Sequence, residues 1–207
     1  MHEPETAPHI GVLAIQGDYE RHAAALEESG ATASLVRNTA DLLRPDGQSL
    51  DGLILPGGES TTMLKFLDRG GLFEALRTFA EQKPVFGTCA GAILLAREVR
   101  HPAQPSLGIL DIAVERNAYG AQRDSAILTL ETNLPEWQEL GPLEAVFIRA
   151  PRIAETGPAV EILAERDGFP VLIRQGNTLA ATFHPELSAD RRIHTLFISL
   201  VQLARKS

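Results

Sequence analysis

The sequence is poor in cysteine, in positive charge and in long apolar runs. Among its 207 residues cysteine occurs once, at position 89, which rules out an internal disulfide. The 19 Lys and Arg residues are outnumbered by 27 Asp and Glu, and the formal net charge of −8 disfavours nucleic acid or an anionic membrane as the main partner. No apolar segment approaches the roughly 20 residues that cross a bilayer, and residues 1–9 lack the basic start and apolar stretch of a secretory signal. We therefore expect a cytoplasmic protein that binds neither nucleic acid nor membrane.

The hydrophobic content of 44% is enough for a full core, and we expect one domain over residues 10–207 preceded by a flexible extension over residues 1–9. In the first half, short apolar runs alternate with helix-like stretches. Strands are expected over residues 10–15, 33–36, 51–55 and 84–88, and helices over 19–29 and 60–82, the second with a break at Gly70 and Gly71. This alternation predicts an α/β fold with a mostly parallel sheet covered on both faces by helices.

The second half has a different pattern, with short strand candidates separated by Gly, Pro and Asn, which favours antiparallel pairing. These candidates cover residues 110–115, 125–130, 145–148, 160–164, 171–175 and 178–183. A helical stripe over residues 188–204 closes the chain. Asp18, Ser60 and Ser188 are the residues that we expect to cap the helices that follow them.

Cys89 stands where an apolar run ends at a turn of small residues and a second apolar stretch begins. This pattern predicts a strand, a sharp turn and a helix, with the cysteine side chain held above the sheet edge. Gly87 and Gly91 flank the cysteine, where a larger side chain would meet the crossing backbone. Far downstream, His184 and Glu186 provide an imidazole and a carboxylate two residues apart, as a thiol nucleophile requires.

Attack of a thiol on a carbonyl carbon needs a nucleophile, a group that takes and returns a proton, and donors for the oxyanion. We assign these roles to Cys89 and His184, with Glu186 orienting the imidazole. The backbone amides of Gly58 and Ala90 are the candidate oxyanion donors. Because ligands collect at the carboxyl ends of parallel strands, residues 16–17, 57–60 and 89 are expected to meet on one rim.

Six segments carry a resemblance to a known family: residues 11–18, 55–62, 86–91, 115–120, 147–151 and 183–187. Together they resemble the glutaminase subunits of pyridoxal 5'-phosphate synthase. The cysteine turn and the distant His-x-Glu are shared by the wider class I glutamine amidotransferases. The segments Gly-Gly-Glu-Ser-Thr-Thr, Glu-Arg-Asn-Ala-Tyr-Gly and Phe-Ile-Arg-Ala-Pro narrow the resemblance to this family.

The resemblance implies a three-layer, flavodoxin-like sandwich that hydrolyses L-glutamine to glutamate and ammonia through a glutamyl thioester, with no cofactor and no metal. The partner it implies is a (β/α)8-barrel synthase subunit, with a dodecameric core that receives the ammonia. It also implies that the loop at Gln16 rearranges to complete the oxyanion hole when the partner docks. The substrate pocket it implies is lined by Gly58, Glu59, Ser60, Arg116, Ile148 and Arg149.

Several points stay open at this level. Spacing does not say which of Arg116 and Arg149 contacts the substrate carboxylate. Ala121 stands where the family commonly has arginine, and Arg123 is a possible substitute. A glutaminase subunit of another amidotransferase pathway, or a thiol-sensing protein of the same fold, are the alternative functions. The remaining histidines, including His22 and His194 on expected helices, are interpreted as structural or solvated.

Overall fold

The computed structural model describes residues 6–116 and 125–206. The α-helices are α1 (Tyr19–Glu28), α2 (Ser60–Leu67), α3 (Leu72–Gln82), α4 (Ala90–Leu95) and α5 (Arg192–Lys206). The strands are β1 (His9–Leu13), β2 (Thr32–Val36), β3 (Gly52–Leu55), β4 (Val85–Thr88), β5 (Ala96–Arg100), β6 (Leu110–Glu115), β7 (Ala126–Leu130), β8 (Leu143–Phe147), β9 (Arg152–Thr156), β10 (Glu161–Arg166), β11 (Phe169–Gln175) and β12 (Thr178–Ala181).

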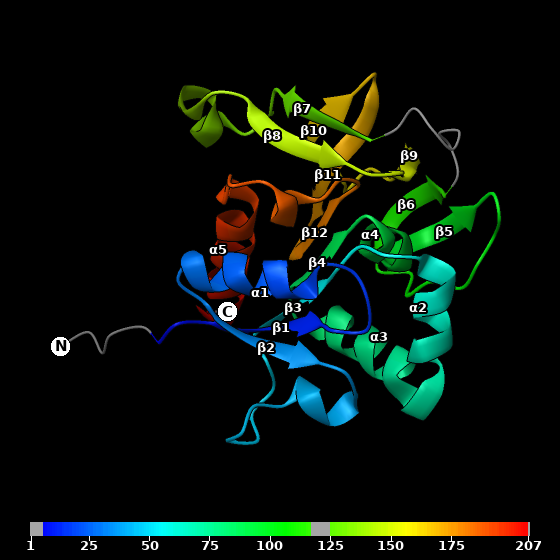
Figure 1. Ribbon diagram of the computed structural model, residues 1–207, viewed down its shortest axis with the longest axis vertical. Helices are drawn as coiled ribbons and strands as arrows, with labels where there is room; N and C mark the ends of the chain where they lie inside the picture. Colours follow the sequence, from blue (N-terminus) through cyan, green and yellow to red (C-terminus); the bar gives the residue numbers. More distant parts are fainter. Residues whose placement is uncertain (1–5, 117–124, 207) are drawn as a thin grey trace.

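The main sheet has seven strands in the order β10-β11-β12-β4-β3-β1-β2 (Figure 1). The five strands from β12 to β2 run parallel, and β11 and β10 extend the sheet with antiparallel pairing. The predicted fold class, a mostly parallel central sheet with added antiparallel strands, is therefore confirmed.

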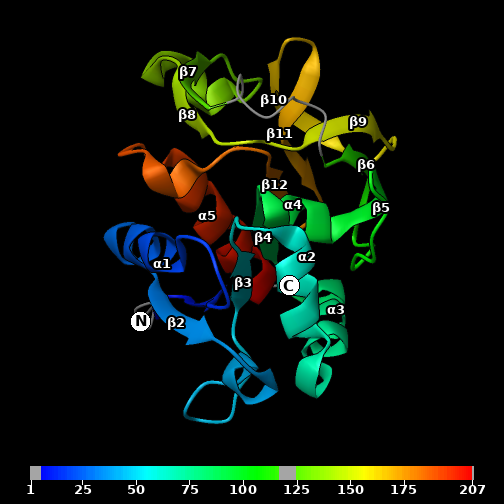
Figure 2. The same cartoon turned by 45° about the vertical axis from the view of Figure 1, so that its right-hand side comes forward.

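The central strands are buried on both faces, and β3 and β4 have no exposed residue. On one face, Ile54 and Phe86 of these strands share a core with α1 and α5. On the other face, Leu55 and Val85 pack with α2, α3 and α4. Figure 2 shows the sheet between these two groups of helices. The arrangement is the three-layer sandwich expected from strands that are apolar on both sides.

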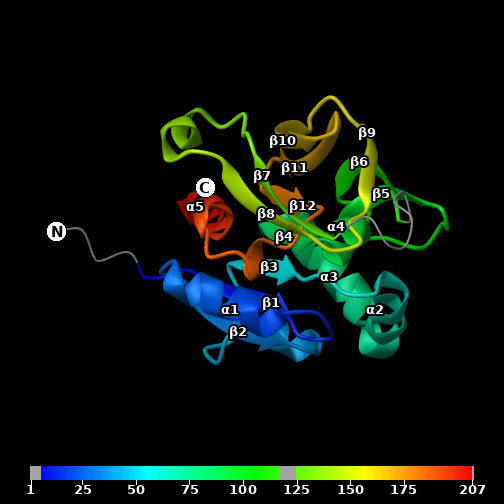
Figure 3. The same ribbon diagram turned by 45° about the horizontal axis from the view of Figure 1, so that its top comes forward.

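Two smaller sheets extend this sandwich. One has the order β5-β6-β9, and the other is the β7–β8 hairpin, which lies beside the start of α5 (Figure 3). The strands β5 and β9 were not predicted from the sequence, and the expectation of antiparallel pairing was wrong for β6 with β5, which pair in parallel. The helix expected after Cys89 ends at Leu95, where Leu107 N and Ile109 N donate to the carbonyl oxygens of Leu94 and Leu95 and a strand begins.

The helix caps differ from those predicted. The N-cap of α2 is Glu59 rather than Ser60, since its carboxylate accepts hydrogen bonds from Thr61 N and Thr62 N. Ser188 is not a cap, because α5 begins at Arg192. Asp18 does precede α1, but its side chain makes no capping hydrogen bond.

The N-terminal boundary also differs from the expected one. Residues 6–9 are attached to the domain: Thr32 N donates to Pro8 O, His9 N donates to Asp51 Oδ2, and Arg205 donates to Thr6. Residues 1–5 of the expected extension lie outside the described residues, as do Ala121 and Arg123. Within the described part, no helix combines the length and the apolar character needed to cross a membrane.

Candidate active site

Cys89 occupies the turn between β4 and α4, with φ 49° and ψ −105°. A non-glycine residue with positive φ is uncommon, and it is held here by the surrounding backbone. A Cβ at Gly91 would lie 1.8 Å from Leu55 O, and one at Gly87 would lie 2.6 Å from Gly91 O. The prediction that larger side chains would collide at both positions is confirmed, and the close packing fixes the direction of the thiol.

His184 and Glu186 lie on the segment that follows β12. His184 Nδ1 is 2.7 Å from Glu186 Oε1, and both side chains are buried. Burial alone would lower the pKa of His184, but contact with Cys89 and with Glu186 outweighs it, and the net shift is upward to about 10. The imidazole is therefore poised to carry a proton beside the thiol.

Burial would raise the pKa of the Glu186 carboxyl group. His22 and His184, which face its two oxygens, outweigh this effect and hold the pKa below its ordinary value. Glu186 is therefore an anion within the protein interior, and its role in orienting the His184 imidazole stays a prediction.

A cavity of about 310 Å³ opens above the thiol. Most of the residues expected in the site line it, namely Gly58, Glu59, Ser60, Cys89, Arg116, Ile148, Arg149 and His184, and they are joined by Gly17, Asp18 and Ile93. Glu186 lies behind His184 and is not part of the cavity lining. The structure thus brings together segments from distant parts of the chain, as the parallel-sheet argument predicted.

The carboxylate of Glu59 is engaged in local contacts. It accepts hydrogen bonds from Thr61 N at 2.9 Å and from Thr62 N and Thr62 Oγ1, each at 2.7 Å. The bond from the Thr62 side chain contributes most to lowering the pKa of Glu59 to about 2. Glu59 therefore carries a fixed negative charge at the cavity wall, and its role toward a substrate ammonium stays a prediction.

The two candidate arginines differ in their contacts. Arg116 Nη2 donates to Thr61 Oγ1 at 2.8 Å and lies 3.5 Å from Glu59 Oε1. Arg149 follows β8 with φ 45° and is exposed, and no hydrogen bond or ion pair holds its guanidinium within the described residues. Within the described residues the whole guanidinium of Arg149 is thus unbonded, whereas Arg116 uses its Nη2.

The Gln16 loop packs against the proposed oxyanion segment. Gln16 Nε2 donates to Glu59 O at 2.5 Å, and a Cβ at Gly58 would lie 2.8 Å from Gln16 Cδ. Gly58 itself has φ 134°, a conformation that favours glycine. Ala90 is buried at the first position of α4. The roles of Gly58, Ala90 and the Gln16 loop in binding an oxyanion stay predictions.

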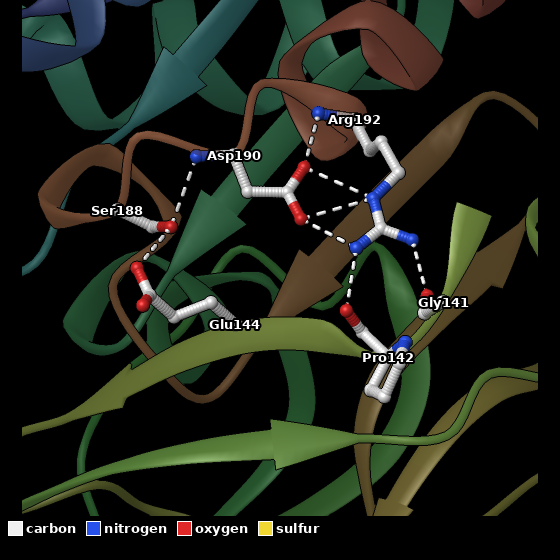
Figure 4. Close-up of polar contacts among 6 residues, drawn as sticks. All are labelled: Gly141, Pro142, Glu144, Ser188, Asp190 and Arg192. Atoms are coloured by element: carbon white, nitrogen blue, oxygen red, sulfur yellow. Dashed lines mark hydrogen bonds and ion pairs between the residues drawn. The ribbon is translucent and has the colours of Figure 1, made fainter.

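A network of polar contacts anchors the segment beyond Glu186 (Figure 4). Ser188 Oγ donates to Glu144 Oε1 at 2.6 Å and accepts from Asp190 N at 3.0 Å. The Arg192 guanidinium bonds Asp190 and the carbonyl oxygens of residues 141 and 142.

This network ties the start of α5 to the hairpin strand β8, and His184 N adds a bond to Val146 O at 2.8 Å. Because β8 leads directly into Ile148 and Arg149, the histidine segment and that wall of the cavity are held as one unit.

The residues that surround Glu186 were not predicted from the sequence. His22 and His194 are fully buried and contact each other, and His22 also contacts Glu186 and Thr88. Helical periodicity could have indicated that His22 is buried, because His22 shares a face of its helix with the apolar Ala25 and Leu26. Two buried histidines on facing helices indicate a polar contact inside the core.

Comparisons with known proteins agree with this geometry. The profile of the SNO glutamine amidotransferase family matches residues 12–203. The chain is 56% identical to the pyridoxal 5'-phosphate synthase subunit PdxT of Koribacter versatilis, covering 93% of this chain and 95% of that protein. It is 52% identical to the PdxT of Solibacter usitatus, with coverages of 92% and 97%.

Solved structures also superpose on this chain. A crystal structure of a glutamine amidotransferase superposes with a TM-score of 0.82 at 45% identity, covering 93% of this chain and 98% of the other. The structure of PurLQS from Thermotoga maritima superposes with a TM-score of 0.64 at 17% identity, covering 96% of this chain and 97% of the matched chain, which shows a shared fold alone.

Proposed function

The chain belongs to the SNO glutamine amidotransferase family and is an enzyme of the glutaminase type, and we propose that it hydrolyses L-glutamine to supply ammonia for pyridoxal 5'-phosphate synthesis. The observation that carries the proposal is the cavity at the strained turn of Cys89, with His184 beside it and the buried Glu186 behind.

The first half of the proposed reaction forms a thioester. The Cys89 thiolate attacks the side-chain amide carbon of glutamine, a C–S bond forms, and the carbonyl electrons move to oxygen. The backbone N–H groups of Gly58 and Ala90 donate to this oxyanion, with the Gln16 loop completing the hole. The intermediate collapses as His184 gives its proton to the nitrogen, and ammonia leaves.

The second half restores the enzyme. Water attacks the glutamyl thioester while His184 takes a proton from it, and the C–S bond breaks to release glutamate and the thiolate. Throughout, Glu186 holds the imidazole and stabilises its charged form. Each step moves one proton through a single histidine, so a base and an acid on separate residues are unnecessary.

Glutamine recognition needs a cation for the α-carboxylate. We assign this to Arg149, because none of its donors is bonded within the described residues, whereas Arg116 already donates through Nη2 to Thr61 beside Glu59. A free guanidinium binds a carboxylate with two parallel hydrogen bonds. Arg116 then keeps Glu59 in place at the wall where the substrate ammonium would sit, and Ser60 and Ile148 complete the pocket.

The relatives at 52% and 56% identity favour the pyridoxal 5'-phosphate pathway over other amidotransferase pathways. We therefore propose that the ammonia passes to a (β/α)8-barrel synthase subunit in an assembly with a dodecameric core. Transfer within a complex suits the chemistry, since free ammonia at neutral pH is mostly protonated and no longer nucleophilic. The thiol-sensing alternative gives no reason for the buried histidine and glutamate beside Cys89.

Glutamate release from L-glutamine tests the proposal. The purified chain is assayed alone and mixed with the pyridoxal 5'-phosphate synthase barrel subunit from the same source, together with Cys89→Ala. We expect release that rises sharply in the mixture and is lost in Cys89→Ala, while synthesis continues when ammonium salt is added. A wild-type mixture that releases no glutamate would contradict the pathway assignment.

A further inference from the structure

A buried pair of histidines lies behind the carboxylate of Glu186, on the side away from the cavity. His22 comes from α1 and His194 from α5, and both are fully buried. His22 Nδ1 is 3.0 Å from His194 Nε2. His22 Nε2 is 3.2 Å from Glu186 Oε2 and 3.1 Å from Thr88 Oγ1.

The protons in this pair can be assigned from the contacts. Burial lowers the pKa of His194 to about 3, so its ring is neutral and has one N–H. His194 Nδ1 is buried without a partner among the described residues. Orphaned N–H groups are rarer in protein interiors than under-satisfied acceptors, so we place the hydrogen on Nε2, which then donates to His22 Nδ1.

With its Nδ1 accepting, His22 in its neutral form has its proton on Nε2, directed toward Glu186 and Thr88. Of these two contacts, the one to Thr88 Oγ1 is a hydrogen bond, whereas Glu186 Oε2 is buried 3.2 Å from His22 Nε2 and has no hydrogen-bond partner among the described residues. The other oxygen of Glu186, Oε1, is already bonded to His184. One carboxylate oxygen is therefore bonded to the His184 ring, and the other lies within ion-pair distance of the His22 ring.

We propose that His22, fixed in its tautomer by His194, is a positioning residue of the glutaminase reaction that holds Glu186 ionised and aimed at His184. The inference rests on the proposed function for its kinetic consequence. It extends the assigned set by two residues that do not contact substrate and that come from helices on one face of the sheet.

The side chains packed around the two histidines are mainly apolar and aromatic. The Phe86 ring lies edge-on to both His22 and His194. Besides burial, the groups that influence the pKa of His194 are His22, Glu186 and Arg191. In such surroundings a carboxylate that lost one donor would either rotate or take up a proton, and both would weaken its support of the His184 imidazolium.

Substitutions of His22 can separate its two contacts. His22→Gln places an amide N–H near the Nε2 position and keeps a donor for Glu186. His22→Asn is shorter and reaches His194 but not Glu186. His22→Leu removes both contacts. Leu26→Ala, one turn along α1 and fully buried, is the matched control for damage to that helix without contact to Glu186.

The variants are assayed in the complex with the synthase subunit for kcat and KM of glutamate release, with thermal unfolding recorded in parallel. We expect His22→Leu and His22→Asn to lose about 10- to 100-fold in kcat at unchanged KM, as for loss of a hydrogen bond to a charged group. His22→Gln should recover most of the loss. Leu26→Ala should keep kcat within about 3-fold despite lower stability.

A second readout needs no turnover, namely the rate of Cys89 alkylation by iodoacetamide against pH. We expect the curve of His22→Leu and His22→Asn to shift to higher pH, and that of His22→Gln to match the wild type. The inference would be overturned if His22→Gln and His22→Asn behaved alike, or if His22→Leu kept wild-type kcat and alkylation. It would also be overturned if Leu26→Ala lost as much kcat as His22→Leu. Should the wild type release no glutamate, the proposed function fails while the alkylation series still decides this one.

Discussion

Gly57 offers a direct test of the active-site geometry. It follows β3, and its backbone does not require glycine, since its φ is not positive. A Cβ at this position would lie 2.5 Å from His184 Cε1, 3.2 Å from His184 Nδ1 and 3.4 Å from Cys89 Cβ. The substitution Gly57→Ala therefore inserts one methyl group between the histidine and the turn that carries the thiol.

The size of the effect follows from these distances. Carbon atoms in contact are about 3.5–4.0 Å apart, so the imidazole must move by about 1 Å. The hydrogen bond from His184 Nδ1 to Glu186, now 2.7 Å, would be stretched or broken by such a movement. A misplacement of about 1 Å costs roughly 100-fold in rate, or about 2.7 kcal/mol of transition-state stabilisation. We expect kcat/KM of Gly57→Ala to fall by that factor.

The assay is glutamate release in the complex with the synthase subunit, and Gly52→Ala is the control. Gly52 opens the same strand, and a Cβ there would lie 2.7 Å from Val201 Cγ2 and 3.3 Å from Phe197 Cζ, remote from the thiol. Overpacking costs about 1–3 kcal/mol of stability, so Gly52→Ala should melt earlier yet retain its kcat/KM. Wild-type kcat/KM in Gly57→Ala, or an equal loss in Gly52→Ala, would refute the reasoning.

Three further predictions concern the cavity wall, the buried carboxylate and the anchor beyond it. Arg149→Met should raise KM for glutamine by about 10- to 100-fold, as for loss of a charged hydrogen bond, and Arg116→Met by less; equal KM values would contradict the assignment. The folded-state pKa of Glu186 lies below the ordinary value of 4.5, so its ionised form stabilises the fold above pH 4.5 and this contribution is lost as the pH falls further. The stability difference between wild type and Glu186→Gln in urea unfolding should therefore shrink below that pH, and a constant difference would argue against an ionised Glu186. Ser188→Ala should lower the free energy of unfolding by about 1 kcal/mol, through loss of its bond to Glu144, with the cavity chemistry retained; a collapse of kcat would show that the anchor matters more for activity than for stability.

The main sheet was predictable because its strands are short apolar runs that end at Gly, Pro or a polar cluster. The rim of the site followed from this, since parallel strands bring residues 16–17, 57–60 and 89 to one edge. The strand over Ala96–Arg100 was not predictable, because its polar residues give no clear alternation and it depends on a partner strand more distant in the chain.

Contacts between helices that are far apart in the chain could not be predicted from the sequence either. His22 and His194 are 172 positions apart, and only the packing of α1 against α5 brings them together. Glu59 was assigned to substrate binding from its motif, whereas its capping role depends on where α2 starts. The difference between Arg116 and Arg149 likewise comes from a side-chain contact with Thr61 that spacing cannot reveal.

The most direct test of the central claim is the mass of the chain after rapid acid quenching of the glutamine-fed complex, followed by peptide mapping. The account predicts a glutamyl adduct on the peptide that contains Cys89, which disappears as glutamine is exhausted and never forms in Cys89→Ala. Glutamate release at the wild-type rate by Cys89→Ala, or an adduct on another residue, would contradict it.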